Sequence, residues 1–306
     1  MIALTNKIAN LTWVWIAPRI LSVAEPKASL LNQLERDLPE GLIVDAAWLE
    51  ERGIASNLRS YYVSASWLEQ PVRSVYRRPR GELTWQQVVI SLQTLILKTP
   101  LVVGGRTALE LHGFAHYIPQ DIEAIHLYGP KKPPGWLQKL GLEQSFVYHN
   151  SARLFRGDSM YICPEPDAVA DQVAGEHLRS RIRGDGLTTL AWGHWGWELT
   201  LSQPERAFLE MLDELPNAES FHQVDMIMQG ASTFSPRRLQ KLLLECTSVK
   251  VKRLFFFFAD RHRHAWLERL DKEAIDFGKG KRMLVRDGRL DPEYLITVPK
   301  DLHVVS

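Results

Sequence analysis

The segment from residue 42 to residue 80 constrains the fold more than any other part of the chain. A short helical pattern follows Asp45 and ends at Gly53, and a second helical pattern begins at Ser56. A run with strand-like alternation follows at residues 72–77, and the segment ends in arginines at 77, 78 and 80. Helix, tight turn, helix and basic β-ribbon are the order of a winged helix-turn-helix. The sequence therefore predicts this motif here.

A further helix is predicted before this segment. Residues 27–38 carry leucines at the spacing of one helical face, and a proline and a glycine end the pattern. Asp45 is suited to cap the next helix, and Gly53 is suited to the left-handed residue that terminates it. We therefore expect a winged helix-turn-helix domain over residues 26–98, preceded by an extension at residues 1–25.

The helix predicted to begin at Ser56 has one face suited to nucleic acid. Its apolar side chains recur at i, i+4 and i+7 and so share one side. The opposite side carries Asn57, Ser60, Tyr61 and Ser64, with Arg59 on its flank. Small polar groups, an amide and a guanidinium suit base edges and phosphates in a major groove. A solvated face, or a surface that binds another protein, is the alternative interpretation.

Charge is distributed unevenly along the chain. Residues 52–80 contain six arginines and one acid, Glu69, which is a local net charge of +5. Such a ribbon favours contacts with phosphates or the minor groove. There are 11 basic and 9 acidic side chains in residues 1–100, and 10 basic and 17 acidic ones in residues 101–234. Residues 235–306 contain 16 basic and 10 acidic side chains. Because the whole chain is only +1, attraction to DNA must come from local patches.

The remaining 208 residues, 99–306, are expected to form a second domain of mixed α and β structure. A helix over 83–97 should join the two domains. A strand, two glycines at 104–105 and a helix suggest either a tight turn or an anion site. Residues 202–205 have the pattern of a capping box before a helix, and residues 283–285 and 294–298 look like strands. The carboxylates of Glu210, Asp213 and Glu214 are expected to face water.

No catalytic signature is recognisable in the sequence, so we expect no enzyme, metal or cofactor. The histidines lack a spacing that brings three or four metal ligands together. An enzyme that acts on nucleic acid through the basic C-terminal region, with Arg261, His262 and His264, is a minor alternative. Two cysteines cannot build a disulfide framework, and the longest early apolar run is too short to cross a membrane. We therefore expect a cytoplasmic protein.

Several separated blocks, in order between residues 26 and 301, carry a family resemblance. They read DAAWLEERGIASNLRSYYVSASWLEQ with VYRRP, VGGRTALELHGFAHY, SQPERAFLEMLDELP, SVKVKRLFFFFADRHRHAWLERLD and GKRMLVRDGRLDPEYLITVPKD. The chain resembles the AbiEi family, the antitoxins of type IV abortive-infection toxin–antitoxin systems. The resemblance implies an α+β fold, with an N-terminal winged helix-turn-helix and a larger C-terminal antitoxin domain.

The same resemblance implies two roles. The N-terminal domain would repress its own operon by binding inverted repeats in promoter DNA, and the C-terminal domain would neutralise a nucleotidyltransferase-like toxin without forming a stable complex. By position, the DNA contacts would be Ser56, Asn57, Arg59, Ser60, Tyr61, Arg73, Arg77 and Arg78. Residues 70–74 lack the glycine common at the family's wing turn. A stand-alone regulator, whose C-terminal domain senses a ligand or partner, is the alternative.

Overall fold

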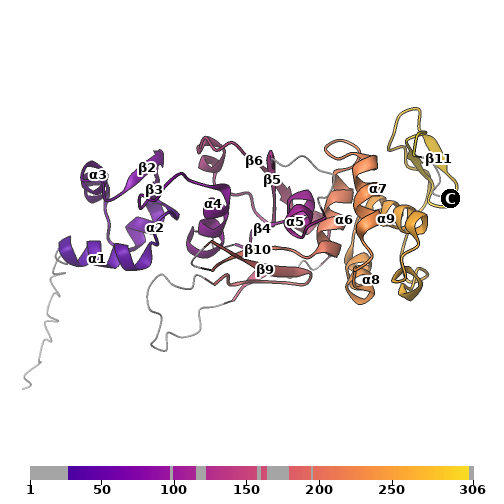
Figure 1. Ribbon diagram of the computed structural model, residues 1–306, viewed down its shortest axis with the longest axis horizontal. Helices are drawn as coiled ribbons and strands as arrows, with labels where there is room; N and C mark the ends of the chain where they lie inside the picture. Colours follow the sequence, from indigo (N-terminus) through magenta and orange to yellow (C-terminus); the bar gives the residue numbers. More distant parts are fainter. Residues whose placement is uncertain are drawn as a thin grey trace, which may run out of the picture.

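The computed structural model describes residues 27–96, 99–114, 122–156, 160–163, 179–193 and 196–302, so the expected extension at 1–25 lies outside the described residues. The molecule is elongated (Figure 1). A small N-terminal module lies at one end, a mixed sheet lies in the middle, and a group of helices and a short hairpin complete the other end. This is the α+β architecture predicted from the sequence.

The N-terminal module has the element order of a winged helix-turn-helix. It consists of α1 (Lys27–Asp37), β1 (Ile43–Asp45), α2 (Ala46–Glu51), α3 (Ser56–Ser64), β2 (Glu69–Val72) and β3 (Val75–Arg77). The three strands form an antiparallel sheet in the order β1-β3-β2. The sequence predicted one strand over 72–77, whereas the structure turns there and makes a hairpin, which is the wing.

Local sequence explains the turn between α2 and α3. The Asp45 side chain accepts a 2.9 Å hydrogen bond from the Trp48 amide and so caps α2, as predicted. Gly53 follows the helix with φ of +77°, the left-handed conformation that glycine adopts without steric cost. The next helix begins at Ser56, as predicted, and Ala55 is its N-cap without a side-chain hydrogen bond.

A shared helix joins the module to the rest of the chain. The helix α4 (Trp85–Ser91) continues into a π-helical turn, η1 (Leu92–Ile96). On one side, the Ile43 amide donates a 2.9 Å hydrogen bond to the Ser91 hydroxyl. On the other side, Gln93 donates to the backbone oxygens of Leu101 and Thr200, at 2.9 and 2.8 Å. A single hydrophobic core runs through both parts, so the expected boundary at residue 98 stays a prediction.

The central sheet has five strands. They are β4 (Val102–Val103), β5 (Ala124–Gly129), β6 (Ser145–Asn150), β9 (Leu187–Trp192) and β10 (Trp197–Ser202), in the order β6-β5-β4-β10-β9. The pairs β5–β6 and β4–β10 are parallel, and the other two neighbouring pairs are antiparallel. The helix α5 (Gly105–Leu111) follows β4 directly. The antiparallel strands β9 and β10 form a hairpin at one edge of this sheet.

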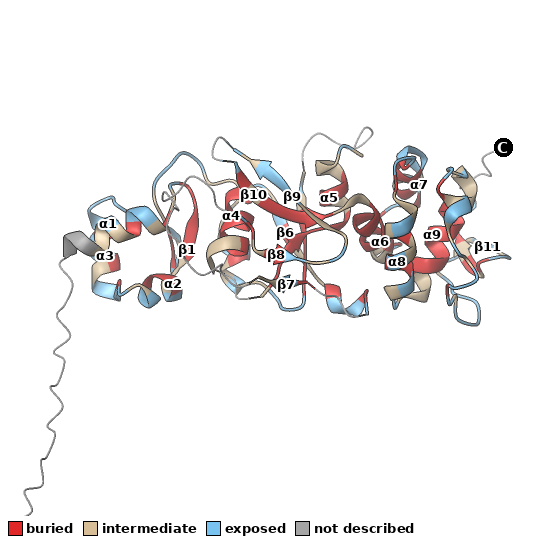
Figure 2. Cartoon of the chain, turned by 90° about the horizontal axis from the view of Figure 1, so that it is seen from below, coloured by how far each residue is buried: buried red, intermediate tan, exposed pale blue. Residues whose placement is uncertain are grey.

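Helices make up most of the final third. They are α6 (Pro204–Glu214), α7 (Phe221–Gly230), α8 (Pro236–Glu245) and α9 (Val249–His262). The apolar run at 254–259 is buried within α9 (Figure 2). Short elements complete the chain: η2 (Gly135–Lys139), η3 (Ser151–Arg153), β7 (Tyr161–Ile162), β8 (Ile182–Arg183), η4 (Leu267–Arg269), β11 (Arg289–Asp291) and β12 (Ile296–Val298).

Two local predictions were wrong. The capping box does not form, because Ser202 is the last residue of β10 and Gln203, without a side-chain cap, precedes α6. Residues 283–285 are not a strand, since the partner of β12 is β11, further along the chain. Within the described residues, no helix is long and apolar enough to cross a membrane.

Candidate nucleic-acid interface

The polar side of α3 faces solvent. Ser56, Asn57, Ser60 and Tyr61 are all exposed, with 57% of Tyr61 accessible. On the opposite side of the helix, Tyr62 is buried in the core of the module, where burial raises the pKa of its hydroxyl. The amphipathic division predicted for this helix is therefore present in the structure.

The serines of this surface are held by their own helix. The Ser60 hydroxyl donates to the Ser56 backbone oxygen at 3.1 Å, and the Ser64 hydroxyl donates to the Tyr61 oxygen at 2.8 Å. Both hydroxyl oxygens keep lone pairs that can accept. The Asn57 carbonyl oxygen accepts from the Leu58 amide at 2.8 Å, which leaves its amide NH₂ as a donor. The surface thus presents donors and acceptors together, as base recognition requires.

The wing tip is a two-residue turn, Arg73 and Ser74, between β2 and β3. Ser74 has φ of +66°, so this serine takes the left-handed conformation for which glycine was expected. Its backbone oxygen accepts a 2.9 Å hydrogen bond from the Ala46 amide, which stabilises the turn against α2. Arg73 is exposed and forms no ion pair with another described residue. A tight wing therefore forms without glycine and presents one free cation.

The structure places Arg59 inside the module and not on the flank of the polar surface. Its guanidinium donates to the Ile54 backbone oxygen at 3.0 Å and to the Glu50 carboxylate at 2.9 Å. It also lies 5.9 Å from the centre of the Tyr76 ring on β3. Only 7% of this side chain is accessible. Arg59 therefore joins the two helices and the wing to one another, and the assignment of a DNA contact to it needs correction.

Two wing arginines are also engaged within the protein. Arg77 pairs with Glu69 on the neighbouring strand and donates to the Gly81 oxygen at 2.8 Å, with 11% of its side chain accessible. Arg78 donates to the backbone oxygens of Glu35 and Leu38 at 3.0 and 3.1 Å. Its bonds therefore cap the end of α1, and only 20% of its side chain is accessible.

The expected ribbon of free arginines is therefore reduced to its tip. The local net charge of +5, calculated for residues 52–80, did not include acidic residues that lie elsewhere in the chain. Arg52 pairs with Asp37 at 3.6 Å, and Arg78 and Arg80 both approach Glu40, at 3.2 and 3.8 Å. Sequence reasoning missed these partners because they are 15 to 40 residues away along the chain.

In the C-terminal part, an internal carboxylate occupies the glycine turn that suggested an anion site. The Gly105 amide donates a 2.9 Å hydrogen bond to Glu210, which also accepts from Ser202 at 3.0 Å and from Arg206 at 2.9 Å. A Cβ at Gly104 would clash with this carboxylate. Glu210 is fully buried, contrary to the prediction that it faces water. Burial raises the pKa of Glu210, although Arg206 and the hydrogen bonds act in the opposite direction.

A chain of two histidines and a carboxylate lies beside this turn. The His149 Nδ1 atom is 2.9 Å from Glu214, and its Nε2 atom is 3.0 Å from the Nδ1 atom of His126. Burial and the neighbouring His149 lower the pKa of His126 to about 4. Burial raises the pKa of Glu219 to about 7, although the charge of Arg106, at 3.9 Å, acts in the opposite direction. No local pattern predicted this cluster, because its members are far apart along the chain.

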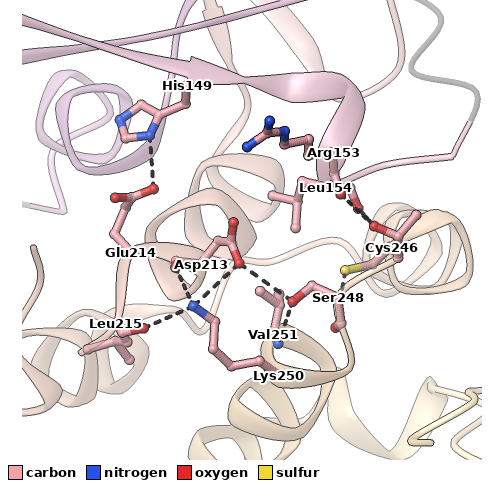
Figure 3. A network of polar contacts seen from close by, with 11 residues as sticks. His149, Arg153, Leu154, Asp213, Glu214, Leu215, Cys246, Ser248, Lys250 and Val251 are labelled. Atoms are coloured by element: carbon pink, nitrogen blue, oxygen red, sulfur yellow. Dashed lines mark hydrogen bonds and ion pairs between the residues drawn. The ribbon is translucent and has the colours of Figure 1, made fainter. Parts of the chain in front are cut away.

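A polar network joins the sheet to the helices next to this cluster (Figure 3). Lys250 of α9 donates to the Leu215 backbone oxygen at 2.9 Å and pairs with Asp213 of α6 at 3.4 Å. The His149–Glu214 contact continues the network toward β6. Every group in it has a partner inside the protein, which indicates a structural role.

The minor alternative, a catalytic use of residues 261–264, finds no support in the geometry. Arg261 and His262 both bind the Asp225 carboxylate, at 3.0 and 2.8 Å, and these contacts lower the pKa of Asp225 to about 2 against the effect of its burial. His264 bonds to the Met228 backbone oxygen at 2.7 Å. Within the described parts of the chain, no three His, Cys, Asp or Glu side chains converge in an arrangement that could hold a metal ion.

Fold and surface together define a transcriptional regulator of the winged helix-turn-helix class, with a second, larger α+β part. Residues 27–120 match the family model for transcriptional regulators described as the AbiEi antitoxin N-terminal domain, and residues 185–299 match that described as AbiEi antitoxin, type IV toxin–antitoxin system. The chain belongs to the AbiEi family of type IV antitoxins.

A solved structure is also similar to this chain. It is the crystal structure of the RV2827C protein from Mycobacterium tuberculosis, with 16% sequence identity, a TM-score of 0.45, and coverage of 88% of this chain and 90% of that one. No curated protein matches the chain.

Proposed function

We propose that this AbiEi protein represses its own operon by placing α3 in the major groove of promoter DNA. The exposed polar side of α3 carries this proposal, since Ser56, Asn57, Ser60 and Tyr61 have no apolar neighbour that covers them. Arg73, at the wing tip, would contact phosphate or the adjacent minor groove. Arg59, Arg77 and Arg78 would act indirectly, because they hold the helices and wing in place.

A second group of exposed basic side chains supports nucleic-acid binding, although the net charge of the whole chain is only +1. Residues 279–289, around β11, carry five exposed basic side chains and one acid: Lys279, Lys281, Arg282, Arg286, Arg289 and Asp287. None of the five forms an ion pair with another described residue. This basic lobe lies at the opposite end of the molecule from α3 (Figure 1). It would contact DNA that bends around the protein, and such contacts would depend on salt.

The C-terminal part would neutralise the toxin of the same operon, which we expect to be nucleotidyltransferase-like. Family membership supports this role, and we assign it to the proposed second domain, residues 99–306. Co-expression tests it directly. A chain that lacks the first 98 residues would not be a fair test, because α4 shares the core with both parts. The full chain with a disabled α3 surface should therefore still rescue cells from the toxin.

A gel-shift assay with the region upstream of the gene tests the repressor role. We expect preferential binding over random duplex of the same length at moderate salt. Arg73→Ala should weaken binding to both duplexes, whereas Asn57→Ala should weaken binding to the specific duplex only. Arg269→Ala, an exposed arginine outside the module, is the matched control. Equal binding to promoter and random DNA would refute the proposal.

One observation favours the alternative of a ligand-sensing regulator. A groove of about 280 Å³ lies where the wing meets the C-terminal part, lined by Glu69, Gln70, Pro71, Arg77, Leu83 and Leu140. The Nη1 atom of Arg77 is buried there and has no hydrogen-bond partner among the described residues, which is uncommon for a buried donor. A small molecule with an acceptor group would satisfy it and shift the wing. The test is to add the small-molecule fraction of a cell extract to the protein–DNA complex. Loss of DNA binding by the unmodified chain, but not by Leu140→Trp, would support this alternative.

A further inference from the structure

The outer edge of β9 is the least protected part of the central sheet. β9 ends the sheet on one side and β6 ends it on the other. At the β6 edge, the Gln138 side chain donates a 2.6 Å hydrogen bond to the Phe146 backbone oxygen. Among the described residues, the hydrogen bonds of residues 188–192 run to β10 alone. Within the described residues, a side-chain hydrogen bond therefore protects the β6 edge, whereas the β9 edge has no such contact.

Composition and exposure set this edge apart. Thr189, Leu190 and Ala191 are exposed, with 39% of Leu190 accessible. No Lys, Arg, Asp or Glu lies between Asp185 and Glu198. The pairing of β9 with β10 is continuous over six residue pairs, without a bulge. Proteins usually protect an edge strand with charge, proline or a bulge, and β9 has none of these.

We propose that β9 pairs, antiparallel, with β9 of a second copy of this chain. Every second residue of an edge strand directs its N–H and C=O outward, and an identical strand satisfies them. A two-fold axis between the strands places uncharged side chains opposite one another, so no like charges meet. The two five-stranded sheets would then form one continuous sheet across the axis.

The surface area that six paired edge residues bury is small compared with the area that a stable dimer buries. The contact should therefore be weak between free chains and become significant when two copies are held close together. DNA with two half-sites provides this proximity, because it raises the effective concentration of one copy beside the other. This consequence rests on the proposed function, whereas the pairing itself does not.

Cysteine cross-linking of the free protein tests the pairing. In a chain with Cys163→Ser and Cys246→Ala, cysteine is introduced singly at Thr189, Leu190 or Ala191, and at Leu244 as an exposed control on α8. At high protein concentration, at least one β9 variant should oxidise to a covalent dimer at least about tenfold faster than the control. Rates equal to the control at all three positions would overturn the proposal, provided that circular dichroism shows each variant folded.

DNA binding provides the second test, with Leu190→Lys and the control Leu244→Lys. On a duplex with two half-sites, Leu190→Lys should weaken binding of the second copy about tenfold, which corresponds to about 1.4 kcal/mol. Its affinity for a single half-site should equal that of the control. Unchanged cooperativity with intact single-site binding would refute the pairing alone. Absence of any specific DNA binding by the unmodified chain would refute the repressor role, and cross-linking would still decide the pairing.

Discussion

Replacing Glu219 by Gln should make the stability of this protein sensitive to acid, because it removes one of two opposing proton equilibria. His126 and Glu219 are both at least 93% buried in the C-terminal part. Burial lowers the pKa of His126 from 6.5 to about 4 and raises the pKa of Glu219 from 4.5 to about 7. Each difference corresponds to about 3 kcal/mol between the two protonation states.

The two contributions have opposite signs. As pH falls from 6.5 to 4, the unfolded chain protonates its histidine before the folded protein protonates His126, so stability is lost. As pH falls from 7 to 4.5, the folded protein protonates Glu219 before the unfolded chain does, so stability is gained. The contributions of these two groups to the free energy of unfolding should therefore nearly cancel between pH 7 and pH 4 in the unmodified protein.

In Glu219→Gln, only the histidine contribution remains. We expect the free energy of unfolding, measured by urea denaturation, to fall by up to about 3 kcal/mol between pH 6.5 and pH 4 relative to the unmodified chain. Glutamine has the shape of the protonated carboxyl, so folding at mildly acidic pH should be preserved. The control is Glu123→Gln, which removes an exposed carboxyl and should leave the pH profile unchanged.

Two results would refute this reasoning. A Glu219→Gln profile parallel to that of the unmodified chain would show that Glu219 is already ionised in the folded protein below pH 7. A reciprocal variant, His126→Gln, should instead gain stability as pH falls, because Glu219 is then unopposed. A loss with acid in that variant would show that another group dominates.

Three further predictions follow from single side chains. Arg59→Ala should lower the free energy of unfolding by about 2 kcal/mol, because it removes one buried and one partly buried charge-assisted hydrogen bond; an unchanged melting temperature would contradict its structural role. Arg73→Ala should leave the melting temperature unchanged and reduce the slope of log affinity against log salt by about 1, and an unchanged slope would show that the wing tip does not touch DNA. Glu210→Ala should destabilise the protein by about 3 to 5 kcal/mol, because the buried guanidinium of Arg206 then loses the carboxylate that neutralises it. An unchanged melting temperature would contradict this prediction.

Local patterns were enough to predict the N-terminal module. Asp45 and Gly53 act through bonds to residues a few positions away, so their roles as cap and terminator could be read from the sequence. The amphipathic division of α3 follows from helical periodicity alone. The buried centre of α9 at 254–259 was likewise evident from its composition.

The roles of the arginines could not be predicted from local patterns, because their binding partners lie elsewhere in the sequence. Arg59 and Tyr61 are two positions apart on one helix, yet one is buried and the other is 57% accessible. Periodicity placed Arg59 on the flank of the surface, and packing against β3 decided its environment. Charge counted along the chain likewise overestimated the free cations of the wing, because Asp37 and Glu40 neutralise arginines from outside the counted segment.

The sequence by itself determined the order of helices and strands, the polar side of α3 and the family, because these depend on neighbouring residues and on blocks in fixed order. Only the tertiary structure decided which charges are free, where Glu210 and the histidine pair lie, and which edge of the sheet is open. These properties depend on residues far apart in sequence that packing brings within a few ångströms, where burial and contact set the energy of each group.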